Sequence, residues 1–416
     1  MSQRDSLFVL ALLLLLHSSS TKPLLPPIST ADLAALHEIK DSLADIPSGT
    51  TAAAFFSTWD FTSPDPCSSF SGVTCSLRRV TTLTLGTGLS DSPGLSGKLS
   101  PSLSKLTELT QLVLFSGIVT GLIPTQLGNL KNLRVISLTN NRLIGPIPTT
   151  ISTLPNLHTL DLSNNQLTGS VPARISELAQ LRVLVLAGNR LTGEVPHLPA
   201  QLLHLDLKSN KLSGMLPSPM PSSLRYLSAS MNQMWGPLNG LESLSDLVYL
   251  DLSMNHFNGA IPFSLFRPSL SSMLLQRNNL SGGVPPLLPP PPSPPTYPPG
   301  SMVDLSHNFL TGELSPVLAD VESVFLNNNR LIGTVPKLYV ESVYKGTTKT
   351  LYLQHNYITH FPVEPGSALP DSVSLCLNYN CMVPPVGLTA CPESSGGLLS
   401  RPLCQCSVFN NGSSIG

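Results

Sequence analysis

Charged and aromatic residues are scarce in this sequence. Lys, Arg, Asp and Glu make 11% of its 416 residues, aromatic residues make 6%, and the formal net charge is −1. The balanced charge excludes a strongly basic nucleic-acid-binding domain and a polyacidic tail, so we expect no nucleic-acid partner. After residue 20 there is no run of about 18 apolar residues, which predicts a mature chain without a transmembrane helix.

Motifs typical of enzymes are missing as well. The chain contains no G-x-S-x-G, H-E-x-x-H, P-loop or G-x-G-x-x-G pattern. Asp161, Asp206, Asp251 and Asp304 recur at one position of a repeated pattern, which favours a structural role over paired acid and base carboxylates. We therefore predict a protein that is not an enzyme and has no cofactor and no metal site.

The N-terminus has the features of a secretory signal peptide. An apolar run over residues 7–16 follows Arg4 and precedes three serines, and it is too short to span a membrane. We place the signal peptide at residues 1–20. The C-terminus is polar and lacks the hydrophobic tail of a lipid-anchor signal. These features predict a secreted protein.

The cysteines gather near the two ends of the chain, and the long middle contains none. They are Cys67, Cys75, Cys376, Cys381, Cys391, Cys404 and Cys406. In an oxidising compartment this distribution predicts disulfides that close two caps. We expect Cys67 to bond Cys75, because the other five lie far away in sequence. The pairing of those five stays open; Cys404 is our guess for the odd thiol, because it breaks the spacing around Cys406. A metal site there is disfavoured, because no histidine cluster lies near it.

Between the cysteine clusters the sequence repeats. LRVISLTNNRLIGPIP from Leu133 is followed by LHTLDLSNNQLTGSVP from Leu157 and LRVLVLAGNRLTGEVP from Leu181. Two earlier copies have Gly88 and Gly117 where later copies have Asn. That Asn recurs every 21 to 30 residues, at Asn141, Asn165, Asn189, Asn210, Asn232, Asn255, Asn278, Asn308, Asn329, Asn356 and Asn378. The period identifies a leucine-rich repeat, with about thirteen copies over residues 80–375.

Each part of the repeat has a physical role. Leu160 and Leu162 alternate with polar residues, so the leucines point into a solenoid and the polar residues point to its open face. The amide of Asn165 can satisfy backbone groups of neighbouring turns. Gly169 suits a turn where a side chain would crowd the next coil. We predict a curved solenoid with short parallel strands on the concave face, loops and 3-10 turns on the convex side, and a short helical N-terminal cap.

Two segments carry a resemblance to a known family. The L-(T/S)-G-x-(I/V)-P signature resembles the plant-specific class of extracellular leucine-rich repeats. Residues 21–79 resemble the N-terminal cap shared by plant receptor-like proteins, receptor kinases and polygalacturonase-inhibiting proteins, with W…DPC…W-x-G-V-x-C. The matching residues are Trp59, Asp65-Pro66-Cys67 and Cys75, with Phe70 where the family usually has Trp, after a helix that points Leu33, Leu36, Ile39 and Leu43 inward. The C-terminal cap, residues 376–416, departs from the usual close cysteine pair.

A proline-rich segment and two sequons stand apart from the repeat. Residues 285–300 read PPLLPPPPSPPTYPPG, a polyproline II excursion that we expect to leave from the rim or convex side as a tolerated insertion. A resemblance to extensin-like wall glycoproteins gives the alternative that Ser-Pro-Pro and Tyr297 are modification or cross-linking sites. The sequons predict N-glycosylation at Asn279 and Asn411.

Aromatic and basic residues recur at open-face positions of the expected strands. They are Phe115, His158, Arg182, His204, Lys208, Arg225, Tyr226, Tyr249, Arg277, Phe325 and Tyr352. Residues of these types anchor interfaces, and solenoid curvature gathers them on one concave surface. We predict that this surface binds the ligand. Charges at these positions nearly balance, so electrostatics alone do not favour a polyanion such as pectate.

The resemblance implies a secreted recognition protein in plant signalling or defence that binds a peptide or protein ligand through its concave face. Without a kinase domain of its own, such a protein acts through a membrane co-receptor kinase. The alternatives are an inhibitor of a cell-wall-degrading hydrolase, similar to the polygalacturonase inhibitors, and a structural protein of the cell wall. All three predict an extracellular location, in the cell wall or peripherally at the outer face of the plasma membrane.

Overall fold

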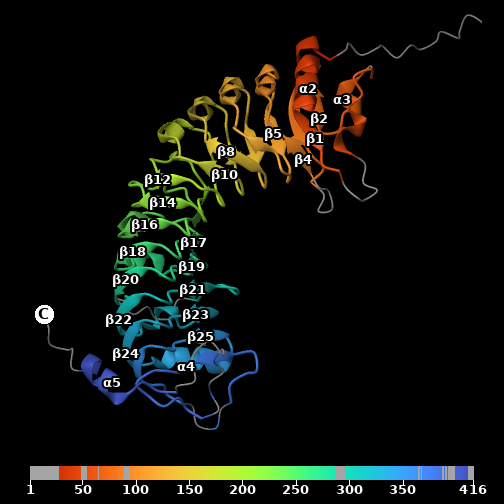
Figure 1. Cartoon of the computed structure of the whole chain (residues 1–416). Coiled ribbons are helices and arrows are strands. Elements are labelled where there is room, and N and C mark those ends of the chain that lie inside the picture. Colours follow the sequence, from red (N-terminus) through yellow and green to blue (C-terminus); the bar gives the residue numbers. More distant parts are fainter. Residues whose placement is uncertain are drawn as a thin grey trace, which may run out of the picture.

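The chain folds into a long arc of stacked turns (Figure 1). This computed structural model describes residues 28–47, 54–63, 65–88, 94–285, 296–363, 366, 368–386, 388, 391 and 399–410. The predicted signal peptide and the sequon at Asn411 lie outside these residues. In the described part of the chain no helix is long and apolar enough to cross a membrane.

The larger sheet runs along the whole arc, one strand per turn. Of its 14 strands, β2 is antiparallel to β3 and every later neighbour pairs in parallel. In spatial order the strands are β2 (Val73–Ser76), β3 (Arg79–Leu85), β5 (Gln111–Leu114), β7 (Val135–Leu138), β9 (Thr159–Asp161), β11 (Val183–Val185), β13 (His204–Asp206), β15 (Tyr226–Ser228), β17 (Tyr249–Asp251), β19 (Ser272–Leu274), β21 (Met302–Asp304), β23 (Ser323–Phe325), β25 (Thr350–Tyr352) and β27 (Ser374–Cys376). Toward the C-terminus these strands lie on the inner side of the curve in Figure 1.

The strands that follow the inner strands along the chain form further parallel sheets. A three-stranded sheet contains β6 (Thr120–Gly121), β8 (Arg142–Pro146) and β10 (Gln166–Thr168). The second sheet has eight strands: β12 (Thr192–Glu194), β14 (Lys211–Gly214), β16 (Gln233–Gly236), β18 (His256–Gly259), β20 (Asn279–Gly282), β22 (Phe309–Glu313), β24 (Arg330–Thr334) and β26 (Tyr357–His360). In Figure 1, β16 to β24 lie on the outer side of the arc, opposite the strands of the larger sheet.

Short 3-10 helices return the chain from one turn to the next. They are η2 (Pro101–Lys105), η3 (Thr125–Asn129), η4 (Thr149–Thr153), η5 (Ala173–Glu177), η6 (Asn239–Leu241), η7 (Phe263–Leu265) and η8 (Pro316–Leu318). The proline of the repeat starts several of them: Pro172 precedes η5 and Pro262 precedes η7. Proline suits this place because its φ is already close to helical and its missing N–H has no partner to lose.

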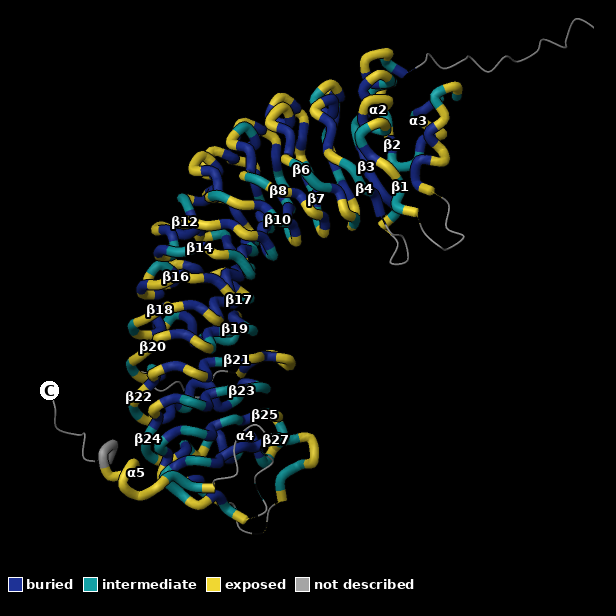
Figure 2. The backbone as a smooth tube through the Cα atoms, viewed as in Figure 1, coloured by how far each residue is buried: buried dark blue, intermediate teal, exposed yellow. Residues whose placement is uncertain are grey.

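The leucines form one continuous core, which Figure 2 shows as buried residues inside every turn. A ladder of asparagines crosses this core. The Nδ2 of Asn165 donates to Leu138 O at 2.7 Å, and its Oδ1 accepts from Leu143 N at 3.0 Å. The predicted ladder is wrong at its last step, because Asn380 and not Asn378 makes these bonds. Asn380 is fully buried, donates to Leu353 O and accepts from Ile358 N.

The glycines of the repeat adopt positive φ, and only some of them are also crowded. A Cβ on Gly145 would lie 2.3 Å from Leu122 Cδ2, as the crowding argument expects. A Cβ on Gly169 would have its nearest neighbour, Pro146 Cβ, at 3.6 Å, an ordinary contact. The reason for glycine at this second position is therefore its φ of 75°, which side chains disfavour.

The N-terminal cap closes the core with aromatic rings. It contains β1 (Leu43–Asp45), paired with β4 (Leu95–Gly97), and η1 (Phe55–Thr58). Trp59 is buried and stacks on Phe70 with ring centroids 5.1 Å apart, and its Nε1 donates to Ser71 O at 2.9 Å. Phe70 thus fills the position that the related caps give to a second Trp.

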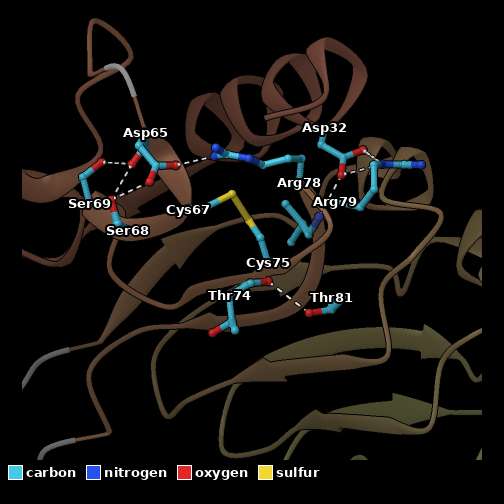
Figure 3. The surroundings of a disulfide bond; sticks show 11 residues. Asp32, Asp65, Cys67, Ser68, Ser69, Thr74, Cys75, Arg78, Arg79 and Thr81 are labelled. Carbon is cyan, nitrogen blue, oxygen red and sulfur yellow. Dashed lines mark hydrogen bonds and ion pairs between the residues drawn. A yellow bond between two sulfur atoms is a disulfide. The ribbon is translucent and has the colours of Figure 1, made fainter. Parts of the chain in front are cut away.

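An ion pair joins the cap helix α2 (Thr30–Ser42) to the first strands (Figure 3). Asp32 is fully buried; it accepts from Arg79 Nε at 3.0 Å and from Val80 N at 2.8 Å. Leu36, Ile39 and Leu43 are buried as predicted, although Leu43 lies beyond the helix, in β1; Leu33 is only partly buried. The sequence pattern did not predict a buried carboxylate on the inward face of this helix.

Disulfides hold both caps. Cys67, in the short helix α3 (Pro66–Ser69), bonds Cys75 as predicted (Figure 3). The C-terminal bonds join Cys376 to Cys391 and Cys381 to Cys406, and Cys404 is the free, exposed thiol, in agreement with our guess.

The last segment lies against the final turns. Just before α5 (Leu403–Asn410), Arg401 contacts two aromatic rings, and within α5 Cys406 is bonded to Cys381. The guanidinium carbon lies 4.1 Å from the ring centroid of Tyr357 and 4.6 Å from that of Tyr379. Its Nε also donates to Asn356 O at 2.6 Å.

The proline-rich insertion ends in a buried tyrosine. Residues 286–295 lie outside the described part, but Tyr297 is only 6% exposed and packs into the core cluster. Burial raises its pKa to about 12. The helix α4 (Lys337–Lys345) contributes the buried Tyr339 to the same core cluster. The interpretation of Tyr297 as an exposed cross-linking site is therefore wrong, because a ring packed in the core is not available to another wall polymer.

Candidate functional site

The strand register sorts the residues of the concave face into columns. The first column, one residue per strand just before the first core leucine, contains Val135, Thr159, Val183, His204, Tyr226, Tyr249, Ser272, Met302, Ser323, Thr350 and Ser374. The second column, two residues later, contains Ser137, Asp161, Val185, Asp206, Ser228, Asp251, Leu274, Asp304, Phe325, Tyr352 and Cys376. Side chains of both columns face away from the core, because strand residues alternate.

The predicted residues fall into several different columns. His204, Tyr226 and Tyr249 share the first column, and Phe325 and Tyr352 share the second. His158 and His204 do not share a column, because His204 is in register with Thr159. The others lie before or after these columns: His158, Arg182 and Arg225 precede the first, and Phe115, Lys208 and Arg277 follow the second core leucine.

Three rings of the first column form a continuous aromatic stack, His204–Tyr226–Tyr249. The first two ring centroids lie 4.0 Å apart at an angle of 4°, and the next two lie 4.5 Å apart at 3°. Each ring is half-buried. Adjacent parallel strands are about 4.8 Å apart, so flat rings at the same register pack face to face. The stack therefore presents ring edges and polar atoms to the open side.

Burial keeps the stack uncharged. It lowers the pKa of His204, although the carboxylates of Asp206 and Asp161 act in the opposite direction. Burial also raises the pKa of Tyr226 and of Tyr249, with a further contribution from neighbouring carboxylates. Near neutral pH the imidazole and both phenols are consequently neutral, and the charge of this region comes from the aspartates.

The aspartates of the second column hold their own strands in place. The Oδ1 atoms of Asp161, Asp206 and Asp251 each accept a bond from the backbone N–H two residues later, at 3.0, 3.0 and 3.1 Å. This is the structural role that the sequence pattern favoured. In the described part of the chain no group of three or more His, Cys, Asp or Glu is arranged to hold a metal ion.

A second aromatic pair lies nearer the C-terminus. Phe325 and Tyr352 meet edge to face, with centroids 5.2 Å apart and an interplanar angle of 87°. The Tyr352 hydroxyl lies 3.1 Å from Ser374 Oγ. The predicted aromatic residues therefore form two separate clusters along the concave face.

Sequence reasoning found only Arg277 of a column of residues with positive φ. They are Asn140, Asn164, Ser209, Met231, Met254, Arg277, His307, Asn328, His355 and Tyr379. Met231 and Met254 are 50% and 45% exposed, and a backbone conformation that favours Gly or Asn is unusual for them. The available signal was their place directly before the ladder asparagine.

The second sheet carries the predicted glycosylation site that the structure describes. Asn279 begins β20 and is exposed, although its neighbour Asn278 is a buried ladder residue. Trp235 of β16 is 48% exposed on the same sheet. Neither residue belongs to the columns of the concave face.

The fold and this face define a leucine-rich repeat protein. The family model described as Leucine rich repeat N-terminal domain matches residues 29–76. Two models described as Leucine rich repeat match residues 131–191 and 246–267. Receptor-like proteins 43 and 35 of Arabidopsis thaliana are each 32% identical to the chain, over 120 and 118 residues. These alignments cover 28% of this chain but only 16% and 12% of the relatives. The matched segments are leucine-rich repeats, and the chain is similar to plant receptor-like proteins.

Solved structures agree with this assignment. The ectodomain of the receptor kinase GASSHO1/SCHENGEN3 from Arabidopsis thaliana, in complex with CASPARIAN STRIP INTEGRITY FACTOR 2, is 30% identical with a TM-score of 0.63. The PEPR1–AtPEP1 structure is 25% identical with a TM-score of 0.57. The alignment with the GASSHO1/SCHENGEN3 ectodomain covers 84% of this chain and 47% of that one. The alignment with the PEPR1 structure covers 85% of this chain and 56% of that one. A plant ice-binding protein is 26% identical, with a TM-score of 0.55, over 83% of this chain and 99% of that one.

Proposed function

We propose that the protein is a secreted recognition protein that binds a peptide or protein ligand through its concave face and acts with a membrane co-receptor kinase. The observation that carries this proposal is the aromatic stack His204–Tyr226–Tyr249, with the exposed Arg225 beside it. Half-buried aromatic rings and arginines supply most of the energy of protein interfaces. The similarity to receptor ectodomains solved with their factors supports the same ligand class.

The test begins with capture of ligands on the immobilised full chain from plant extracellular fluid, followed by affinity measurements with each captured peptide. Tyr249→Ala removes one end of the stack and should weaken binding by about 2 kcal/mol or more, about thirtyfold in Kd, with an unchanged melting temperature. Leu252→Ala, in the core of the same strand region, should instead cost about 2–5 kcal/mol of stability.

The matched control is Trp235→Ala, because it removes an exposed aromatic residue from the second sheet. It should leave ligand affinity unchanged. If Tyr249→Ala keeps full affinity while Trp235→Ala loses it, the ligand binds the outer face and the proposal is wrong. Addition of the captured peptide should also cause the chain to co-elute with a co-receptor ectodomain in size-exclusion chromatography.

Ice binding is a second candidate function. One observation favours it: the alignment with the plant ice-binding protein spans 99% of that chain, while the receptor alignments span about half of theirs. Inhibition of ice recrystallisation by the wild-type chain, with no captured peptide, would favour this candidate. Hydrolase inhibition stays a prediction that a polygalacturonase assay tests directly.

A further inference from the structure

A buried hydroxyl without a partner lies beside the aromatic stack. Ser228 Oγ has no hydrogen bond, and the residue is fully buried although its strand position faces the concave side. Buried hydroxyls without partners are uncommon, because each loses its bonds to water and gains none in return. The place of Ser228 in the sheet therefore raises the question of which group can complete its hydrogen bonding.

Two carboxylates flank this hydroxyl. Register pairs Asp206 of β13 with Ser228 and Ser228 with Asp251 of β17, so the three side chains follow one another across adjacent strands. Each carboxylate uses Oδ1 to accept a backbone N–H of its own strand. Neither Oδ2 has a hydrogen bond to a described residue. This leaves one Oδ2 acceptor on each side of Ser228, with the Cα atoms of the two aspartates about 10 Å apart.

Among the described residues, no basic side chain forms an ion pair with these carboxylates. None of the ion pairs among the described residues involves Asp206 or Asp251. The nearest basic positions along these strands are Lys208 and Arg225, both exposed. Asp206 is partly exposed and Asp251 is 9% exposed, so a ligand reaches this row mainly from the side of Asp206.

The neighbouring rings border the acidic row. Tyr226 and Tyr249 lie two residues before Ser228 and Asp251 on the same strands, so they flank these side chains. Because stacking covers the ring faces, the carboxylates are the groups that bind an ammonium or guanidinium, through charge-assisted hydrogen bonds. Two carboxylates on either side of a hydroxyl without a partner match a positively charged donor group.

We propose that Asp206, Ser228 and Asp251, beside the stacked tyrosines, bind the guanidinium or ammonium group of one basic residue in the peptide ligand. The inference rests on the proposed function and adds to it the chemical class of one ligand residue. The basic side chain donates to the two Oδ2 atoms, and a small shift of the flanking side chains lets Ser228 Oγ accept from it. This makes the middle of the concave face selective for arginine or lysine at one ligand position.

The experiment uses a random 12-residue peptide library selected on the intact, disulfide-bonded chain. Wild type should enrich peptides with arginine or lysine at one recurring position. Asp206→Asn and Asp251→Asn keep an oxygen for the backbone bond but remove the charge, and each should weaken the enriched peptides about tenfold. Ser228→Ala should reduce the preference for the basic residue without lowering the melting temperature.

The matched control is Asp304→Asn. Asp304 occupies the same column and accepts from Ser306 N at 2.9 Å, but its register neighbours are Leu274 and Phe325, away from the stack. This variant should select the same peptides as wild type with the same affinity. Spermidine tests the source of the cation: binding of spermidine, but of no peptide, overturns the assignment to a peptide residue.

The outcomes separate this inference from the proposed function. Enriched peptides without a recurrent basic residue, or a basic preference that Asp206→Asn and Asp251→Asn leave intact, overturn the inference while the proposed function stands. Failure to enrich any peptide, together with no ligand captured from extracellular fluid, overturns the proposed function and with it the inference.

Discussion

Replacing Asn380 by alanine tests the corrected end of the asparagine ladder. Its Nδ2 donates to Leu353 O at 3.0 Å and to Leu377 O at 2.9 Å, and its Oδ1 accepts from Ile358 N at 3.1 Å. Alanine leaves at least two buried backbone groups without partners, at about 1–3 kcal/mol each. We expect a local loss of about 2–6 kcal/mol in the last turns.

Asn378→Ala is the matched comparison. Asn378 is 9% exposed and its Oδ1 has no hydrogen-bond partner. Replacement removes a buried acceptor that is already unsatisfied, so the free energy of local unfolding should change by less than about 1 kcal/mol or rise slightly. Each variant removes one side-chain amide, and the two replaced residues lie only two positions apart in the same cap.

Hydrogen exchange of the last turns is the assay, because damage in a solenoid stays near its site and a global melting curve would dilute it. In Asn380→Ala the protection of the Ile358 amide should fall at least about thirtyfold, since about 1.4 kcal/mol corresponds to tenfold. Equal protection in both variants, or a larger loss in Asn378→Ala, would refute the assignment of Asn380 to the ladder.

Three further predictions concern other parts of the molecule. Arg401→Ala loses two ring contacts and a backbone bond, so α5 should become sensitive to protease at a cost of about 2–3 kcal/mol, while the repeats keep their exchange protection. Deletion of residues 286–295 should leave the melting temperature nearly unchanged, whereas deletion through Pro299 also removes the buried Tyr297 and should lower it. Because the folded-state pKa of His204 is lowered, the unfolded chain binds more protons, and stability should fall as pH drops below about 6.5; His204→Gln should flatten that part of the curve of melting temperature against pH.

The repeating architecture was readable from the sequence because its causes are local. Alternation of leucine and polar residues sets the inward and outward faces of each strand, and the asparagine and glycine positions set the turns. The assignment of Asn378 failed at LNYN, residues 377–380. The ladder Asn stands three residues after the second core leucine, as Asn165 does after Leu162, and this spacing points to Asn380, which the bonds to Leu353 and Ile358 confirm.

The arrangement of the candidate site residues on the concave face depended more on how neighbouring turns pack. The sequence predicted His204, Tyr226 and Tyr249 as outward residues, but their stacking followed from strand register, which insertions and turn lengths shift. Register also separated His158 from His204 by one residue. The unpartnered hydroxyl of Ser228 had no sequence signal, since serine is common at outward strand positions.

By itself the sequence determined the solenoid, its two caps, the Cys67–Cys75 bond and the set of outward side chains, because each depends on neighbours within one repeat or one cap. Only the tertiary structure decided the C-terminal disulfide pairs, the burial of Tyr297 and the columns of the concave face. These features join residues from different turns, and their distances follow from the way the turns stack.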